Sequence, residues 1–152
     1  MRDALWIVTL IFAMLTAGLR PQDSRLPAGD VIRLEFAFTE ARAGDITAGW
    51  NVPGFAGARA IQDRDKWWPW LYGGLLVCLC LLAGGPGAGT YAVLSIVAVL
   101  LDLIENIGMN KMVDGDFSFP WPLIAGIFAT AKFALIGIVL LRIVARLKRG
   151  VV

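Results

Sequence analysis

The sequence predicts an all-α fold, a four-helix transmembrane bundle with an amphipathic extramembrane loop that forms a cap between helices 1 and 2. Two observations predict it. The 152 residues are 58% hydrophobic and only 17% charged, whereas about a quarter of the residues in soluble domains are charged. The charged side chains are also clustered, because all but six lie in residues 1–66 or 142–149. We therefore expect one membrane domain over residues 1–152.

Four apolar segments come close to the roughly 20 residues that a helix needs to cross a hydrocarbon core about 30 Å thick. Backbone polar groups cannot bond to water inside a bilayer, so each segment is expected to be a helix. The expected spans are residues 4–19, 67–83, 90–109 and 121–141.

The first of these segments has a second interpretation, a cleaved signal peptide. Thr16, Ala17 and Gly18 offer small residues at a cleavage site. Asp3, however, weakens the positive charge that precedes the apolar run of a signal peptide. We therefore expect this helix to be retained.

The basic residues indicate how the chain is oriented. The tail at residues 142–149 holds four Lys or Arg side chains, and such clusters stay on the cytoplasmic side. With four spans, both termini are then cytoplasmic and residues 20–66 lie outside. Four basic residues of that outer loop lie close to a membrane end and favour the opposite orientation, namely Arg20, Arg25, Arg64 and Lys66.

The loop at residues 20–66 is long, and its seven basic and seven acidic residues cancel. Near its start, apolar residues occupy every second position, at Ile32, Leu34, Phe36 and Phe38. This is the period of a half-buried strand, although no partner strand is obvious.

Two short helices are expected after that strand. Thr39 followed by an acid is typical of a helix start, and Ile46 and Trp50 then fall on one face. Residues 51–54 break the chain, and residues 56–66 form a second helix that leads into the second span. We expect the loop to lie as an amphipathic cap on the outer membrane surface.

The third span carries three polar residues, Asp102, Glu105 and Asn106. An ionisable group near the centre of a membrane helix costs roughly 2.5–3.5 kcal/mol on insertion scales, so it needs an explanation. Spacings of three and four place all three on one helical face. Ser95, Ala98 and Met109 extend the stripe, and the opposite surface is Ile, Val and Leu.

The fourth span carries Lys132, and the short turn before this span makes the last two helices antiparallel neighbours. Counted from that turn, Asp102 and Lys132 lie at depths that a flexible lysine can bridge. We expect an Asp102–Lys132 ion pair, with Glu105 left nearer the interface. A row of small residues on the same helix would allow close helix approach, at Gly126, Thr130 and Ala134.

Two interpretations of this intramembrane polar cluster are open. It is either a pocket, open to the outer side, in which Glu105 or Asp102 binds a cation, a proton or a ligand head group, or an internal ion pair that fixes helix pairing. An Asp102–Lys132 pair with no cavity beside it would favour the structural interpretation.

Several function classes are excluded. The chain has no histidine, which removes imidazole ligands to haem or zinc and Ser-His or Cys-His catalysis. We predict no catalytic residue, no metal site and no cofactor. A net charge of +2 is too small and too dispersed to indicate nucleic-acid binding.

Two further motifs are interpreted as structural. Cys78 and Cys80 are two residues apart in a helix, so they cannot share a metal ion or a disulfide there. Asp114 and Asp116 flank a glycine in a turn, but no glutamate follows at the spacing of an EF-hand loop.

A resemblance to a known family rests on short motifs. These are the residues 34–37 with Thr39 and Trp50, Leu101-Asp102 with Glu105-Asn106, and Lys132-Phe133. The pattern resembles an uncharacterised family of bacterial four-helix integral membrane proteins with a large loop after the first helix. The resemblance covers most of the chain and implies the bacterial cytoplasmic (inner) membrane and a loop motif at Glu35, Thr39 and Trp50. It implies no activity.

The sequence supports two functional hypotheses. The first is a non-catalytic accessory or structural subunit of a larger membrane complex, or a self-associating scaffold, because apolar helix faces offer packing surface. The alternative is a small membrane enzyme or carrier. It would bind a lipid-like or quinone-like ligand at Asp102, Glu105, Asn106 and Lys132. In either case the lipid bilayer is the expected surrounding.

Overall fold

The computed structural model describes residue 26 and residues 29–149, and this part of the chain forms six α-helices. In chain order they are α2 (Asp30–Glu35), α3 (Glu40–Thr47), α4 (Val52–Asp65), α5 (Trp68–Ala83), α6 (Ala88–Val113) and α7 (Trp121–Arg149). The predicted span at residues 4–19 lies outside the described residues, so the count of four membrane helices stays a prediction.

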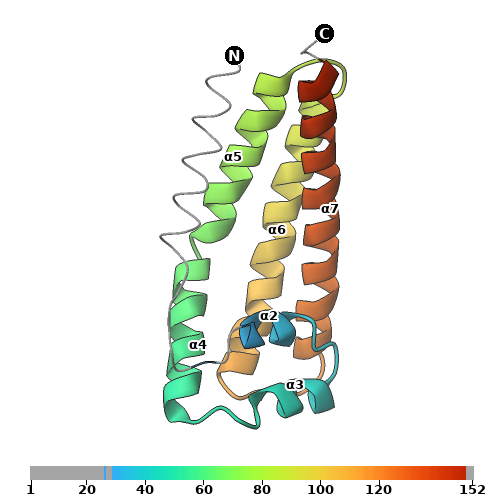
Figure 1. Cartoon of the computed structure of the whole chain (residues 1–152). Helices are drawn as coiled ribbons and strands as arrows, with labels where there is room; N and C mark the ends of the chain where they lie inside the picture. The colour runs from blue at the N-terminus through green and yellow to red at the C-terminus, as the bar shows by residue number, and fades with distance from the viewer. Residues whose placement is uncertain (1–25, 27–28, 150–152) are drawn as a thin grey trace.

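By length and composition, three stretches are long and apolar enough to cross a membrane. They are Val52–Ala83, Ala88–Val113 and Trp121–Arg146. The first comprises α4 and α5 and begins before the expected span at residues 67–83, within the segment predicted as outer loop. The chain is therefore a small membrane protein. In Figure 1 α5, α6 and α7 run side by side, with α6 packed most extensively against α7.

The bounds of α6 and α7 extend beyond the expected spans at 90–109 and 121–141. Glycines with positive φ at Gly84, Gly85 and Gly87 form the turn that ends α5 and begins α6. Gly115 forms a corresponding turn after α6. The polar side chains of α6 therefore lie farther from its C-terminal end than the predicted span places them.

The strand prediction for the loop was wrong, because residues 30–35 form the short helix α2. Asp30 and Leu34 are both buried and stand four residues apart, which places them on one face of a helix. A lone alternating segment has no partner for its backbone groups, whereas a helical turn satisfies them locally. Phe36 and Phe38 follow the helix and pack onto α7.

The helix starts in the loop are set by capping residues. The Thr39 side chain accepts a hydrogen bond from the Arg42 amide at 3.3 Å, which confirms the predicted start of α3. Asn51 accepts one from the Gly54 amide at 3.0 Å. Residues 51–54 therefore begin α4 rather than break the chain, because a capped helix accepts proline in its first turn.

We expect a Thr39→Ala change to loosen the first turn of α3. Loss of a side-chain cap typically costs about 0.5–2 kcal/mol, so the Arg42 amide should exchange its hydrogen faster. Hydrogen exchange of the α3 amides measures this. Thr90→Ala, at an exposed threonine of α6, is the control, and equal exchange in both variants would contradict the capping role.

The core has two parts. One lies where α2, α3 and α4 meet the facing ends of α6 and α7, and it includes Leu34, Ile46 and Met109. The other lies among α5, α6 and α7 and includes Leu76 and Val139. Figure 1 shows α2 and α3 at the end of the bundle where α6 turns into α7. Whether this end faces the outer side of a membrane stays a prediction.

The close approach of α6 to α7 is made at Gly108. A Cβ atom there would lie 2.8 Å from the Trp121 carbonyl oxygen and 3.1 Å from the Ala125 amide nitrogen. The small residues that the sequence singled out on α7 lie elsewhere. Gly126 faces the ring of Phe38, and Thr130 is exposed.

Candidate functional site

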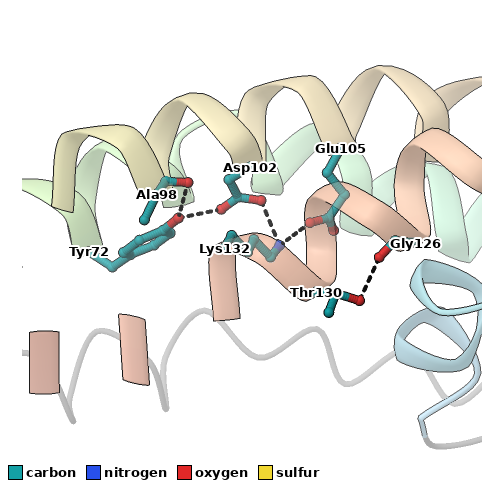
Figure 2. A network of polar contacts seen from close by, with 7 residues as sticks. All are labelled: Tyr72, Ala98, Asp102, Glu105, Gly126, Thr130 and Lys132. Carbon is teal, nitrogen blue, oxygen red and sulfur yellow. Dashed lines mark hydrogen bonds and ion pairs between the residues drawn. The ribbon is translucent and has the colours of Figure 1, made fainter. Parts of the chain in front are cut away.

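The buried ionisable side chains predicted from the sequence meet between α6 and α7, as Figure 2 shows. Lys132 Nζ lies 2.7 Å from Asp102 Oδ1 and 2.7 Å from Glu105 Oε2. The exposed fractions of the three residues are 6%, 2% and 1%. The expected Asp102–Lys132 pair therefore forms, and a second carboxylate shares the same ammonium group.

The expectation left Glu105 outside the Asp102–Lys132 pair and nearer the interface, but Glu105 shares Lys132 with Asp102, and its depth in a membrane stays a prediction. Asp102 and Glu105 are three residues apart on one face of α6, so a single long lysine side chain reaches both. In addition, α6 continues to Val113, which leaves Glu105 two turns inside the helix.

Tyr72 of α5 joins the cluster, and sequence analysis missed it. Its hydroxyl donates a hydrogen bond to Asp102 Oδ2 at 2.8 Å and lies 3.4 Å from the Ala98 carbonyl oxygen. Both oxygens of Asp102 are thus engaged, one by Lys132 and one by Tyr72. The only signal in the sequence was a phenol within an otherwise apolar span.

Two acids from the loop side reach the same site. Glu35, at the end of α2, and Asp65, at the end of α4, line one cavity together with Asp102 and Lys132. Burial raises the pKa of Glu35 to about 7; Lys132 opposes the rise, and the nearby Asp65 and Asp102 add to it. Glu35 was predicted only as part of a loop motif, and Asp65 was not singled out.

Asn106 lies on the predicted face of α6 and is buried. Its backbone carbonyl oxygen accepts a hydrogen bond from the Asn110 side chain at 2.7 Å. Asn106 is also the neighbour of Asp65 across the α4–α6 contact. It therefore lies beside one of the two loop-side acids of the site.

The other two residues of the loop motif have structural contacts instead. Thr39 caps α3. Trp50 is buried, and its indole Nε1 donates a hydrogen bond to Asp30 Oδ2 at 3.1 Å. The Trp50 ring also packs edge-on against Phe55, with ring centroids 5.4 Å apart. These contacts join α2, α3 and α4 rather than line the cavity.

The cavity beside the ion cluster has a volume of about 600 Å³. Its polar end is formed by Glu35, Asp65, Tyr72, Asp102 and Lys132. From there it runs between α5 and α7 along apolar walls, which include Leu75, Leu76 and Leu79 on α5 and Ile136, Leu140 and Ile143 on α7. The lining continues along α7 from Lys132 to Val144, a length of about 18 Å at 1.5 Å per residue.

The remaining motifs lie away from this site. Cys78 is exposed and Cys80 is buried, and both are free thiols. Asp116 holds the turn before α7, because it accepts hydrogen bonds from the Ser118 amide and hydroxyl and from Trp121 Nε1. The Ser118 hydrogen bonds lower the pKa of Asp116. Within residues 29–149, no group of three or more His, Cys, Asp or Glu is arranged to hold a metal ion.

Comparisons with protein families, with characterised proteins and with solved structures find no match to this chain.

Proposed function

We propose that this small membrane protein binds one lipid-like amphipathic molecule, with the tail between α5 and α7 and the head group at the ion cluster. The observation that carries the proposal is the cavity directly beside the Asp102–Lys132 pair. Its volume of about 600 Å³ falls within the range of about 300–1,000 Å³ for small-molecule sites. An ion pair that served only to hold two helices together would need no cavity of this size beside it.

The shape of the cavity supports an elongated occupant. One end is polar and the long walls are aliphatic, which matches a molecule with a head group and a hydrocarbon tail. A tail gains little by leaving lipid for these walls, because lipid chains are as apolar as leucine. Selectivity therefore comes from the head group and the residues that surround it.

The arrangement favours binding over catalysis. Lys132 is the counter-ion of two carboxylates at 2.7 Å, and Asp102 has both oxygens engaged. A lysine nucleophile would need a free, uncharged amine. The proposal is therefore a binding or carrier protein.

A pocket-filling substitution tests this proposal. Leu140 lines the cavity, whereas its neighbour Leu141 is 72% exposed on another face of α7. We expect Leu140→Trp to reduce the amount of tightly bound amphiphile at least tenfold, because the indole occupies the space of the tail. Native mass spectrometry of the full chain, purified in a mild neutral detergent, measures the bound fraction.

Leu141→Trp is the matched control, since it adds the same side chain one residue away, and it should retain the wild-type occupancy. Wild-type protein without any bound amphiphile, or an equal loss in both variants, would overturn the proposed function.

The role as an accessory or structural subunit, which the sequence analysis placed first, stays a prediction. The exposed face of α6 is apolar at Val93, Ile96, Leu100, Ile104 and Ile107. Such a face suits lipid chains and a partner helix equally well, so it does not separate the two functions.

A further inference from the structure

Resting on the proposed function, we infer that the head group of the bound molecule is an organic cation, an amine or a quaternary ammonium group. The inference begins with the charges at the polar end of the cavity. Three carboxyl groups line it there, those of Glu35, Asp65 and Asp102, and Lys132 is the one basic residue among the described residues of the lining. A fourth carboxyl group, that of Glu105, pairs with Lys132 beside the cavity. Acidic groups therefore exceed basic ones where the head group would lie.

The charge of Lys132 is already paired with two carboxylates, so it would bind an anionic head group only weakly. Its Nζ already lies 2.7 Å from one oxygen of Asp102 and 2.7 Å from one oxygen of Glu105. A phosphate or carboxylate would have to compete with both while facing further acids in a medium of low dielectric constant. An anionic lipid is therefore disfavoured, even though a buried lysine lines the cavity.

Glu35 and Asp65 are the groups that a cation would meet. Both line the cavity, and neither forms an ion pair with a Lys or Arg among residues 29–146. They lie on the loop side, on α2 and α4, whereas Lys132 approaches from α7. A cationic head group between them would supply the charge that Lys132 does not.

The inner part of the cluster is also short of donors. Glu105 is 99% buried and points toward Lys132 (Figure 2), yet its Oε1 has no hydrogen-bond partner among the described residues. A buried acceptor left without a donor costs about 1–3 kcal/mol, or more for a charged group. Acceptors are thus already in excess beside the cavity, which further disfavours an anionic head group.

Aromatic rings complete the surroundings of a cation. Trp68 and Tyr72 line the cavity with ring centroids 6.4 Å apart, and Phe133 lines it from α7. Lys132 Nζ itself lies 5.0 Å from the centroid of the Phe133 ring, so this wall already accepts a positive charge. Aromatic faces beside carboxylates are the usual means of binding quaternary ammonium groups.

The experiment compares three amphiphiles that share a dodecyl tail, namely dodecyltrimethylammonium, dodecyl maltoside and dodecyl phosphate. Each is titrated into the full-length protein in nanodiscs of neutral lipid, and binding is followed by native mass spectrometry. We expect the ammonium compound to bind at least tenfold more tightly than the maltoside, and the phosphate to bind most weakly.

A charge-removing variant locates the effect. Glu35→Gln combined with Asp65→Asn should weaken binding of the ammonium compound at least tenfold, so that its preference over the maltoside disappears. The control is Asp45→Asn, which removes an exposed acid of α3 that does not line the cavity and should change neither affinity.

The outcomes separate the two proposals. If all three amphiphiles bind equally and Leu140→Trp abolishes the binding of all three, the cation inference is overturned and the proposed binding cavity is supported. Binding of none, or binding that Leu140→Trp leaves intact, would overturn the proposed function itself. If the double variant does not fold, the order of affinities in the wild-type protein still decides.

Discussion

Replacing Lys132 by methionine is expected to lower the free energy of unfolding by about 3–5 kcal/mol, because it leaves buried carboxylates without their counter-ion. Lys132 is 6% exposed and is shared by Asp102 and Glu105, which are 2% and 1% exposed. Methionine keeps most of the side-chain volume, so the lost charge dominates the effect. Reversible unfolding in mixed micelles with increasing sodium dodecyl sulfate, followed by circular dichroism, measures the change.

Two further variants show whether charge is the cause. Lys66→Met removes an exposed lysine that pairs with Asp63 at 2.6 Å, and it should change stability little, since surface pairs contribute little. Adding Asp102→Asn and Glu105→Gln to Lys132→Met should recover more than half of the loss, because the buried acids are then neutral. A loss below about 1 kcal/mol, the scale of a surface pair, would contradict the buried ion cluster.

Gly108→Val should be the second most disruptive substitution, with a loss of about 2–3 kcal/mol. The atoms that a Cβ would meet, at 2.8 and 3.1 Å, belong to the backbone of α7 and cannot rotate away. The two helices must therefore separate, which also draws Lys132 away from the acids of α6. The same unfolding assay measures the loss.

Gly74→Val is the matched control, because a Cβ at Gly74 meets nothing within 4 Å. It should leave stability nearly unchanged. Equal stability of the two variants would show that the helices are not held at contact distance by Gly108.

The sequence predicted the three described spans because long apolar runs have few alternatives to a helix. It also predicted the start of α3, since a threonine cap is a local signal. The prediction was wrong at α2, because apolar residues occupy every second position from Ile32 to Phe38, which is the period of a strand. This segment is a helix because the helical form buries Asp30 and Leu34 together on one face. That burial depends on contacts with other helices, which the local sequence pattern does not show.

The candidate site was predictable only in part. Polar and ionisable residues are rare within apolar spans, so the sequence alone identifies Asp102, Glu105, Asn106 and Lys132 as candidates. Asp65 lies in a polar segment with other charged residues, so nothing in the sequence separates it from ordinary surface acids. The cavity itself depends on the distance between α5 and α7, which hydropathy does not encode.

The shared lysine has a consequence for how the protein enters the membrane. As α6 leaves the ribosome it carries two acids, each costing roughly 2.5–3.5 kcal/mol near the helix centre on insertion scales. Their counter-ion arrives only with α7, after the short turn at residues 114–120. We expect α6 and α7 to pass from the translocon into lipid together as a helical hairpin, so that the acids and the lysine reach the bilayer already paired.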